Sequence, residues 1–223
     1  MNLPRIVFCA AYLIVLVCYF FSETSGNHKR RVVNKCIMAT MFLAYFVFES
    51  LRNGYWQQPG FALCIIAFFF SWLGDVLLLF SFLYGGISFM IGNIFFVAHL
   101  IVVASQNAVT FGQVWWAIPL FVIAASVCYI LHFTKKVDFK KIGILMPVYV
   151  TTVTAHGMLS MAVASAIGGT HMTLLSMGLV LFMISDYFLT THKFIHHEKW
   201  VLRCNSGTYF TGMLLAAISF TFI

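Results

Sequence analysis

The sequence predicts an all-α membrane protein, a polytopic bundle of about eight transmembrane helices. Three observations predict it: an apolar composition, long unbroken apolar runs, and charges that gather between those runs. Of the 223 residues, 62% are hydrophobic and 9% are charged, and the mean hydropathy is +0.96. A soluble domain is nearer half apolar and a quarter charged. A soluble core of this length could not bury so much apolar surface, so lipid is the predicted solvent.

The apolar runs are long enough to cross a bilayer, which takes about 20 residues of helix. They are continuous and lack the alternating pattern of a membrane barrel, which favours helices. The first run is long and no small-residue cleavage site follows it, so it is expected to be a span rather than a removed signal peptide. Residues 1–223 are therefore expected to form a single transmembrane domain. The predicted spans are 5–21, 33–51, 61–80, 86–105, 114–133, 142–163, 172–190 and 206–223.

The basic residues predict the orientation. Of the 13 Lys and Arg residues, 11 lie in the segments 29–35, 135–141 and 193–203, which fall on one side of an eight-span bundle. Arg5 and Arg52 are left for the other side. Basic loops stay cytoplasmic, so both termini are predicted to be non-cytoplasmic, in a bacterial inner membrane or a eukaryotic endomembrane. The net charge of +7 is explained in this way, and no nucleic-acid partner is predicted.

Two of the six acidic residues, Asp75 and Asp186, fall inside predicted spans and away from their outer ends. An ionisable group in hydrocarbon is costly and by default marks a functional site. The alternative is an aspartate that only hydrogen-bonds to a neighbouring helix and fixes packing. Glu49 is expected near the outer end of the second span. The remaining acids are expected in loops: Glu23, Asp138 and Glu198.

The segments around the two aspartates resemble each other. One reads FSWLGDVLLL and the other FMISDYFL. Each has a small residue before the aspartate, Gly74 or Ser185, where another helix or a ligand could come close. The two spans are four crossings apart and should run in the same direction. A four-plus-four duplication would produce this pattern.

Several polar side chains are predicted to share one layer of the bundle. At 1.5 Å per residue, Asp75 should lie roughly 8–12 Å from the cytoplasmic end of its span. Asp186 should lie at a similar depth, and Lys35 at the mouth of this layer, where it could meet a phosphate. These positions predict a pocket that opens toward the cytoplasmic leaflet. The other predicted members of the layer are Asn93, Tyr149 and Tyr209.

Histidines add candidate residues of a different kind. His99 and His156 are expected deeper, toward the outer half, where a packing role is commoner than a ligand or catalytic role. His192 and His196 have a spacing that could hold a metal on one helix face. A solvated turn facing the lipid headgroups is the favoured interpretation of that pair.

The chain resembles the YhhN-like lysoplasmalogenase family. The matching stretches are FSWLGDVLLLF, GNIFFVAHL and LFMISDYFL. Two positions depart from the family: Lys35 is followed by Cys36 where the family often has Lys-Pro, and Tyr209 is followed by Thr211 and Gly212 instead of Gln. The resemblance implies hydrolysis of the vinyl-ether bond of a lysoplasmalogen, a lysophospholipid. The products would be a fatty aldehyde and a glycerophospho-base, and no metal or organic cofactor is expected.

Two carboxyls suit this chemistry, because vinyl-ether hydrolysis needs a proton donor and a negative group beside the cation that forms. One carboxyl would stay protonated as general acid while the other stays ionised. We expect Asp186 to be the acid and Asp75 the ionised partner. The residues expected to support them are Lys35, Asn93, His99, Tyr149, Ser185 and Tyr209.

Three other interpretations were weighed. An intramembrane aspartyl protease would need Gly in place of Trp72 and Tyr in place of Ser185. A transporter or proton-coupled carrier would fit the intramembrane acids and a four-plus-four repeat. A zinc lipid hydrolase would use His99, His156 and an aspartate. The sequence leaves the headgroup preference and the oligomeric state open.

Overall fold

The computed structural model of the protein describes residues 3–24, 27–139 and 142–223. Within these ranges the regular elements are all helical, which confirms the predicted fold class. The elements are α1 (Leu3–Thr24), α2 (His28–Arg52), η1 (Tyr55–Gln57), α3 (Phe61–Leu78), α4 (Phe82–Gln106), α5 (Phe111–Val114), α6 (Ala117–Phe133), α7 (Leu145–Ile167), α8 (Gly169–Phe194), α9 (Lys199–Ser219) and η3 (Phe220–Phe222).

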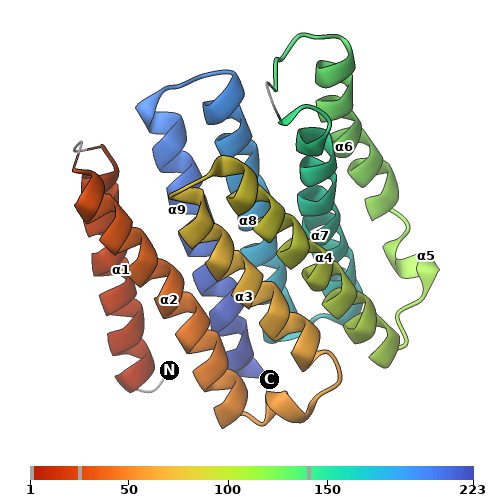
Figure 1. Cartoon of the computed structure of the whole chain (residues 1–223). Helices are drawn as coiled ribbons and strands as arrows, with labels where there is room; N and C mark the ends of the chain where they lie inside the picture. Colours follow the sequence, from red (N-terminus) through yellow and green to blue (C-terminus); the bar gives the residue numbers. More distant parts are fainter. Residues whose placement is uncertain (1–2, 25–26, 140–141) are drawn as a thin grey trace.

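The long helices run up and down the bundle, and both ends of the chain lie at the same end of it (Figure 1). Helices α3 and α8, which carry the two aspartates, run in the same direction, as their sequence positions predict. Short turns join the helices. Between α7 and α8 the backbone enters the left-handed region at Gly168 and Gly169, with φ of 72° and 81°, which glycine adopts without a Cβ clash.

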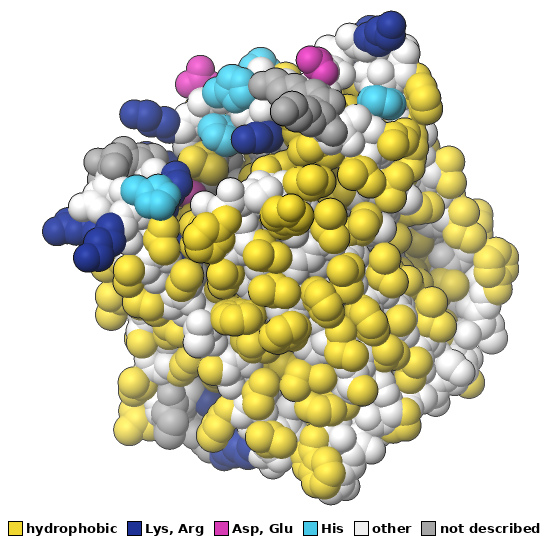
Figure 2. All heavy atoms as spheres, in the orientation of Figure 1, with side chains coloured by type: hydrophobic (Ala, Val, Ile, Leu, Met, Phe, Trp, Pro, Cys, Tyr) yellow, Lys and Arg dark blue, Asp and Glu magenta, His cyan; other side chains and the backbone are white. Residues whose placement is uncertain are grey.

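A hydrophobic belt covers the middle of the molecule, and charged side chains gather at its two ends (Figure 2). Most of the Lys and Arg residues in this view are at one end. Lys140 and Lys141, two of the 11 basic residues that the sequence places on one side of the bundle, lie outside the described residues. An apolar belt between polar ends is the surface expected of a protein embedded in a bilayer.

Six of the eight predicted spans coincide with helices long and apolar enough to cross a membrane. They are α1 from Arg5 to Glu23, α2, α3, α4, α7 and α8. The predicted span 114–133 is divided: α5 is a separate turn of helix, and the apolar helix α6 has only 17 residues. The last helix, α9, is not among the six; it begins at Lys199, earlier than predicted, and its first turns carry polar residues.

Glycines let the helices that carry the site approach one another closely. A Cβ on Gly74 of α3 would lie 2.9 Å from the ring of Phe89 on α4. A Cβ on Gly178 of α8 would lie 2.6 Å from backbone atoms of Gly212 and Ala216 on α9. Real Cβ atoms do not come so near, so these positions need glycine. The close crossings bring the aspartates of α3 and α8 near the side chains of α4 and α9.

One acidic residue is not where the sequence predicted it. Glu23 was expected in a loop, but it lies in the last turn of α1, with 8% of its surface exposed. Helix α1 continues past the predicted end of the span at residue 21 because Tyr19 and Ser206 provide hydrogen-bonding partners for the Glu23 carboxylate. Glu49 lies near the C-terminal end of α2, as the sequence predicts, and it is fully buried.

Candidate active site

Asp75 lies at the centre of the first polar cluster, and 2% of its surface is exposed. The Nζ atom of Lys35, from α2, is 3.2 Å from its Oδ1 atom. The hydroxyl of Tyr209, from α9, donates a hydrogen bond of 2.7 Å to its Oδ2 atom. An adjacent ammonium group stabilises a carboxylate, so this environment favours the ionised form of Asp75.

Asp186 forms the second cluster, and it is buried to the same extent as Asp75. Its Oδ2 atom accepts a hydrogen bond of 2.5 Å from the hydroxyl of Tyr149, on α7. Within residues 3–24, 27–139 and 142–223 the ion pairs include Lys35 with Asp75 and none at Asp186. The two aspartates therefore have similar burial and one tyrosine each, but only Asp75 is paired with a cation.

Both aspartates line one polar pocket with a volume of about 270 Å³. The pocket lies at the end of the bundle where the basic segments gather. Besides the aspartates, the side chains that give it charge are Glu23, Arg31, Lys35 and Lys193. Tyr19, His192, Asn205, Ser206 and Tyr209 add further polar groups. It can take a ligand that bears charges of both signs.

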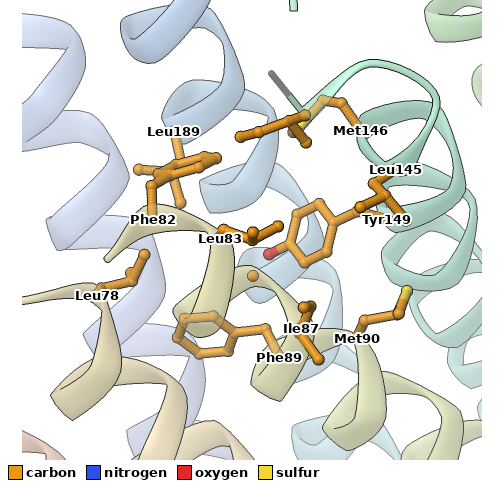
Figure 3. Close-up of a pocket in the computed structure, with 12 residues that line it drawn as sticks. Leu78, Phe82, Leu83, Ile87, Phe89, Met90, Leu145, Met146, Tyr149 and Leu189 are labelled. Carbon is orange, nitrogen blue, oxygen red and sulfur yellow. The ribbon is translucent and has the colours of Figure 1, made fainter. Parts of the chain in front are cut away.

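An apolar groove adjoins the polar pocket. Figure 3 shows its lining, with Tyr149 reaching from α7 to the centre of the side chains that form it. Leu83 and Leu145 on its walls are 38% and 42% exposed. The groove and the polar pocket share four lining residues: Leu78, Phe82, Phe89 and Leu189. An amphiphile could therefore place its polar part beside the aspartates and its chain in the groove.

Three predicted supporting residues line neither the polar pocket nor the apolar groove. Asn93 donates a bond of 3.5 Å to Thr152 on α7. His99 contacts the carbonyl oxygen of Gly60 at 3.2 Å, next to the turn that precedes α3. Ser185 donates to the carbonyl oxygen of Phe182 in its own helix. Their roles in catalysis remain predictions.

The remaining histidines of interest are placed by backbone contacts. His156 Nε2 lies 3.1 Å from the carbonyl oxygen of Leu179, and the imidazole of His197 contacts the carbonyl oxygen of His192 at 2.7 Å. Among the residues that the structure describes, no three His, Cys, Asp or Glu side chains group together in a way that could hold a metal ion.

Glu23 and Phe89 are two pocket residues that the sequence did not identify. Glu23 is hidden in the polar stretch from Ser22 to Lys29, which is typical of a loop. Phe89 is one of 25 phenylalanines, and only its place opposite Gly74 distinguishes it. The polarity of the sequence identified neither residue. The small residue Gly74, directly before Asp75, was the signal in the sequence that a neighbouring helix comes close.

The arrangement can perform acid–base chemistry on an amphiphile. It offers two buried carboxyl groups in different electrostatic surroundings, and tyrosine hydroxyls that fix the position of each. When the surroundings of two carboxyl groups favour opposite protonation states, one group can act as the acid and the other as its ionised partner.

One of the comparisons with known proteins finds a relationship. The model of the YhhN family matches residues 30–220. A search of curated proteins and a search of solved structures found no match. The matched region takes in α3, α7, α8 and α9, with both aspartates and both tyrosines that hold them. The match covers most of the chain and confirms the resemblance seen in the sequence: the protein belongs to the YhhN family.

Proposed function

We propose that the protein is a lysoplasmalogenase, which hydrolyses the vinyl-ether bond of lysoplasmenylethanolamine or lysoplasmenylcholine. The observation that carries the proposal is the polar pocket, in which Asp75 and Asp186 lie next to a groove suited to a fatty chain. Membership of the YhhN family supports it. The sequence contains no GxSxG motif, which is typical of a serine nucleophile that attacks esters.

The reaction begins with proton transfer to carbon. The carboxyl of Asp186 gives its proton to the double-bond carbon that is not bound to oxygen, and an oxocarbenium ion forms at the carbon that is bound to oxygen. Asp75, held ionised beside Lys35 at 3.2 Å, stabilises this cation. General acid catalysis of this kind contributes about 10²–10⁴-fold.

Water completes the reaction. It adds to the oxocarbenium carbon and returns a proton to the Asp186 carboxylate, which gives a hemiacetal. The hemiacetal then loses its hydroxyl proton as the carbon–oxygen bond to glycerol breaks and the glycerol oxygen gains a proton. The products are a fatty aldehyde and the glycerophospho-base, with one water consumed.

The charges of the pocket suit the rest of the substrate. The phosphate would lie near Arg31, Lys35 and Lys193, which line the pocket with the aspartates. The chain would lie in the apolar groove, between α4 and α7. Tyr149 borders that groove and donates to Asp186, which would place the proton donor near the start of the chain.

The decisive test is hydrolysis by the pure protein in detergent. We expect fatty aldehyde from a lysoplasmalogen and no fatty acid from the acyl lysolipid with the same headgroup and chain length. Glu198→Gln, at an exposed acid that makes no capping hydrogen bond, should retain full activity and serves as the control. Equal release of fatty acid from the ester would refute the proposal, and no turnover of either lipid would favour the carrier interpretation.

We also propose that the pocket faces the cytoplasmic leaflet. The 11-to-2 distribution of Lys and Arg residues supports this orientation because basic segments are retained in the cytoplasm. A reporter fused after Ile223 should be non-cytoplasmic, and one inserted near Asp138 should be cytoplasmic. The opposite pair of signals would place the pocket in the other leaflet.

A further inference from the structure

Glu23 is a buried acid at the pocket that the proposed reaction does not use. Its Oε1 atom accepts hydrogen bonds from the hydroxyls of Tyr19, at 3.0 Å, and Ser206, at 2.5 Å. Its Oε2 atom is buried and, among the residues that the structure describes, has no hydrogen-bonding partner. The side chain lines the same polar pocket as Asp75 and Asp186.

The Oε2 atom of Glu23 would be stabilised by a hydrogen-bond donor. A buried carboxylate oxygen without a partner costs free energy, and such groups in native proteins usually mark a missing ligand, water or ion. Lys35 is in the pocket, but its ammonium is paired with Asp75. Among the described residues, the ion pairs within 4.0 Å do not include Glu23.

The surroundings of Glu23 indicate which ligand would satisfy it. The pocket combines this acid with three basic side chains, Arg31, Lys35 and Lys193. A phosphate bound by the basic groups would leave a cationic group, attached a few bonds away, as the natural partner of Oε2. A phosphoethanolamine headgroup has both charges and carries three N–H donors on its amine.

We infer that Glu23 forms a subsite for the ammonium group of an ethanolamine phospholipid, with Oε2 as the acceptor. This inference rests on the proposed function, since it names the headgroup of that substrate. A primary ammonium donates to Oε2, whereas the trimethylammonium group of choline has no N–H to donate. Glu23 is thus a specificity-determining residue that contacts the headgroup and takes no part in proton transfer.

A purely structural role for Glu23 makes a different prediction. The bond from Ser206 on α9 fastens α1 to the bundle, and the bond from Tyr19 holds the Glu23 side chain within α1. Gln keeps the shape of Glu and an oxygen that can accept both bonds. Glu23→Gln therefore preserves the fastening and removes the charge that a cation needs.

The experiment compares three lysoplasmalogens that share one chain and differ in the headgroup: phosphoethanolamine, phosphocholine and phosphate alone. Since hydrogen bonds to charged groups contribute about 1.5–3 kcal/mol, the wild type should prefer the ethanolamine lipid by about tenfold or more in kcat/KM. Glu23→Gln should lose this preference, because its kcat/KM for the ethanolamine lipid should fall toward its kcat/KM for the phosphate lipid. Ser206→Ala, which keeps the carboxylate, should retain the preference. Equal losses on all three lipids, or an unchanged preference in Glu23→Gln, would overturn the inference.

Two further measurements keep the test decisive. A series of N-methylated ethanolamine headgroups, tested on the wild type alone, should show falling kcat/KM, with the largest drop when the last N–H is lost; a flat series would contradict the subsite. Thermal stabilisation of the protein by glycerophosphoethanolamine should exceed that by glycerol 3-phosphate, and Glu23→Gln should remove the difference. This binding measurement needs no turnover. A wild type that shows the binding difference but forms no aldehyde would refute the proposed reaction and leave the ammonium subsite standing.

Discussion

Buried acids occupy both ends of the bundle, and their surroundings differ. At one end, Glu49 is fully buried and both of its oxygens are held by the guanidinium of Arg5, at 3.0 and 2.7 Å. At the other end, Asp75 meets one ammonium and one tyrosine, and Asp186 meets one tyrosine. Each end also has a hollow beside the acid. Burial and an adjacent hollow therefore do not separate the two ends.

The difference lies in how fully each carboxylate is satisfied. A two-point contact with arginine fixes a carboxylate in one geometry and one charge state, and Asn53 adds a third donor to Glu49. This is the environment of an acid that fastens α1 to α2. Asp186 has a hydroxyl partner but no ion pair among the described residues, so its proton can be gained and lost more easily. A buried acid with an incomplete set of partners is the better candidate for chemistry.

The largest expected difference between the two ends is in turnover. Asp75→Asn and Asp186→Asn should each lower kcat by about 10²–10⁴-fold, because Asn can neither donate a carboxyl proton nor carry charge. The double variant should be little worse than either single one, since residues that act as a unit give non-additive losses. Glu49→Gln, the matched change at the other end, should keep near-normal kcat. Aldehyde release under saturating substrate measures all four.

An opposite pattern would reverse the comparison. Near-normal turnover by either Asn variant would make that aspartate a packing residue. A large loss in a folded Glu49→Gln would make the Arg5 end part of the chemistry, and the catalytic assignment would then move toward Glu49, His99 and His156.

The tyrosines should show a smaller contrast. Tyr149→Phe and Tyr209→Phe each remove a hydroxyl that donates to an aspartate. A hydrogen bond to a charged or charging group contributes about 1.5–3 kcal/mol, so each change should lower kcat/KM about tenfold or more. Tyr45→Phe, at the other end, removes only a contact with Thr221 and should leave kcat/KM unchanged. A similar loss in all three would indicate a general effect on folding.

The smallest contrast is in stability, and it separates Asp186 from the two acids that form ion pairs, Asp75 and Glu49. Asp186→Asn should leave the melting temperature in detergent unchanged, since Asn has nearly the shape of a protonated carboxyl, can still accept the hydrogen bond from Tyr149 and breaks no ion pair. Asp75→Asn leaves the ammonium of Lys35 without its carboxylate partner, and Glu49→Gln does the same to the guanidinium of Arg5. Each of these two should cost about 1–3 kcal/mol.

A second substitution separates the charge effect from the loss of Asp75 itself. Lys35→Met combined with Asp75→Asn removes both partners of the pair and should recover most of the stability lost in Asp75→Asn. Failure to recover would show that the hydrogen bond from Tyr209, rather than the ion pair, stabilises this end.

The sequence predicted which acids lie at one end of the bundle better than it predicted how each helix is rotated. Apolar runs and basic segments mark where a helix enters the membrane, so the levels of Asp75, Asp186 and Glu49 could be derived from residue counts. The direction of a side chain around its helix depends on tertiary packing. Asn93 was predicted at the level of the aspartates, yet it donates to Thr152 and does not line the pocket.

Glu23 shows the other limit of the sequence. Its partner Ser206 is 183 residues away in the chain, so nothing local distinguished it from a loop acid. The four-plus-four repeat, suggested by FSWLGDVLLL and FMISDYFL, remains a prediction. Both segments do form parallel helices that carry an aspartate to one pocket.

The apolar groove between α4 and α7 has a consequence for kinetics. Because Leu83 and Leu145 on its walls are 38% and 42% exposed, we expect the proposed lipid substrate to reach the aspartates from within the leaflet without passing through water. The rate then depends on the mole fraction of substrate in the bilayer, which is the concentration used in surface-dilution kinetics. Diluting the lysolipid with inert phospholipid would slow such an enzyme even when the amount of lysolipid per volume of sample stays the same.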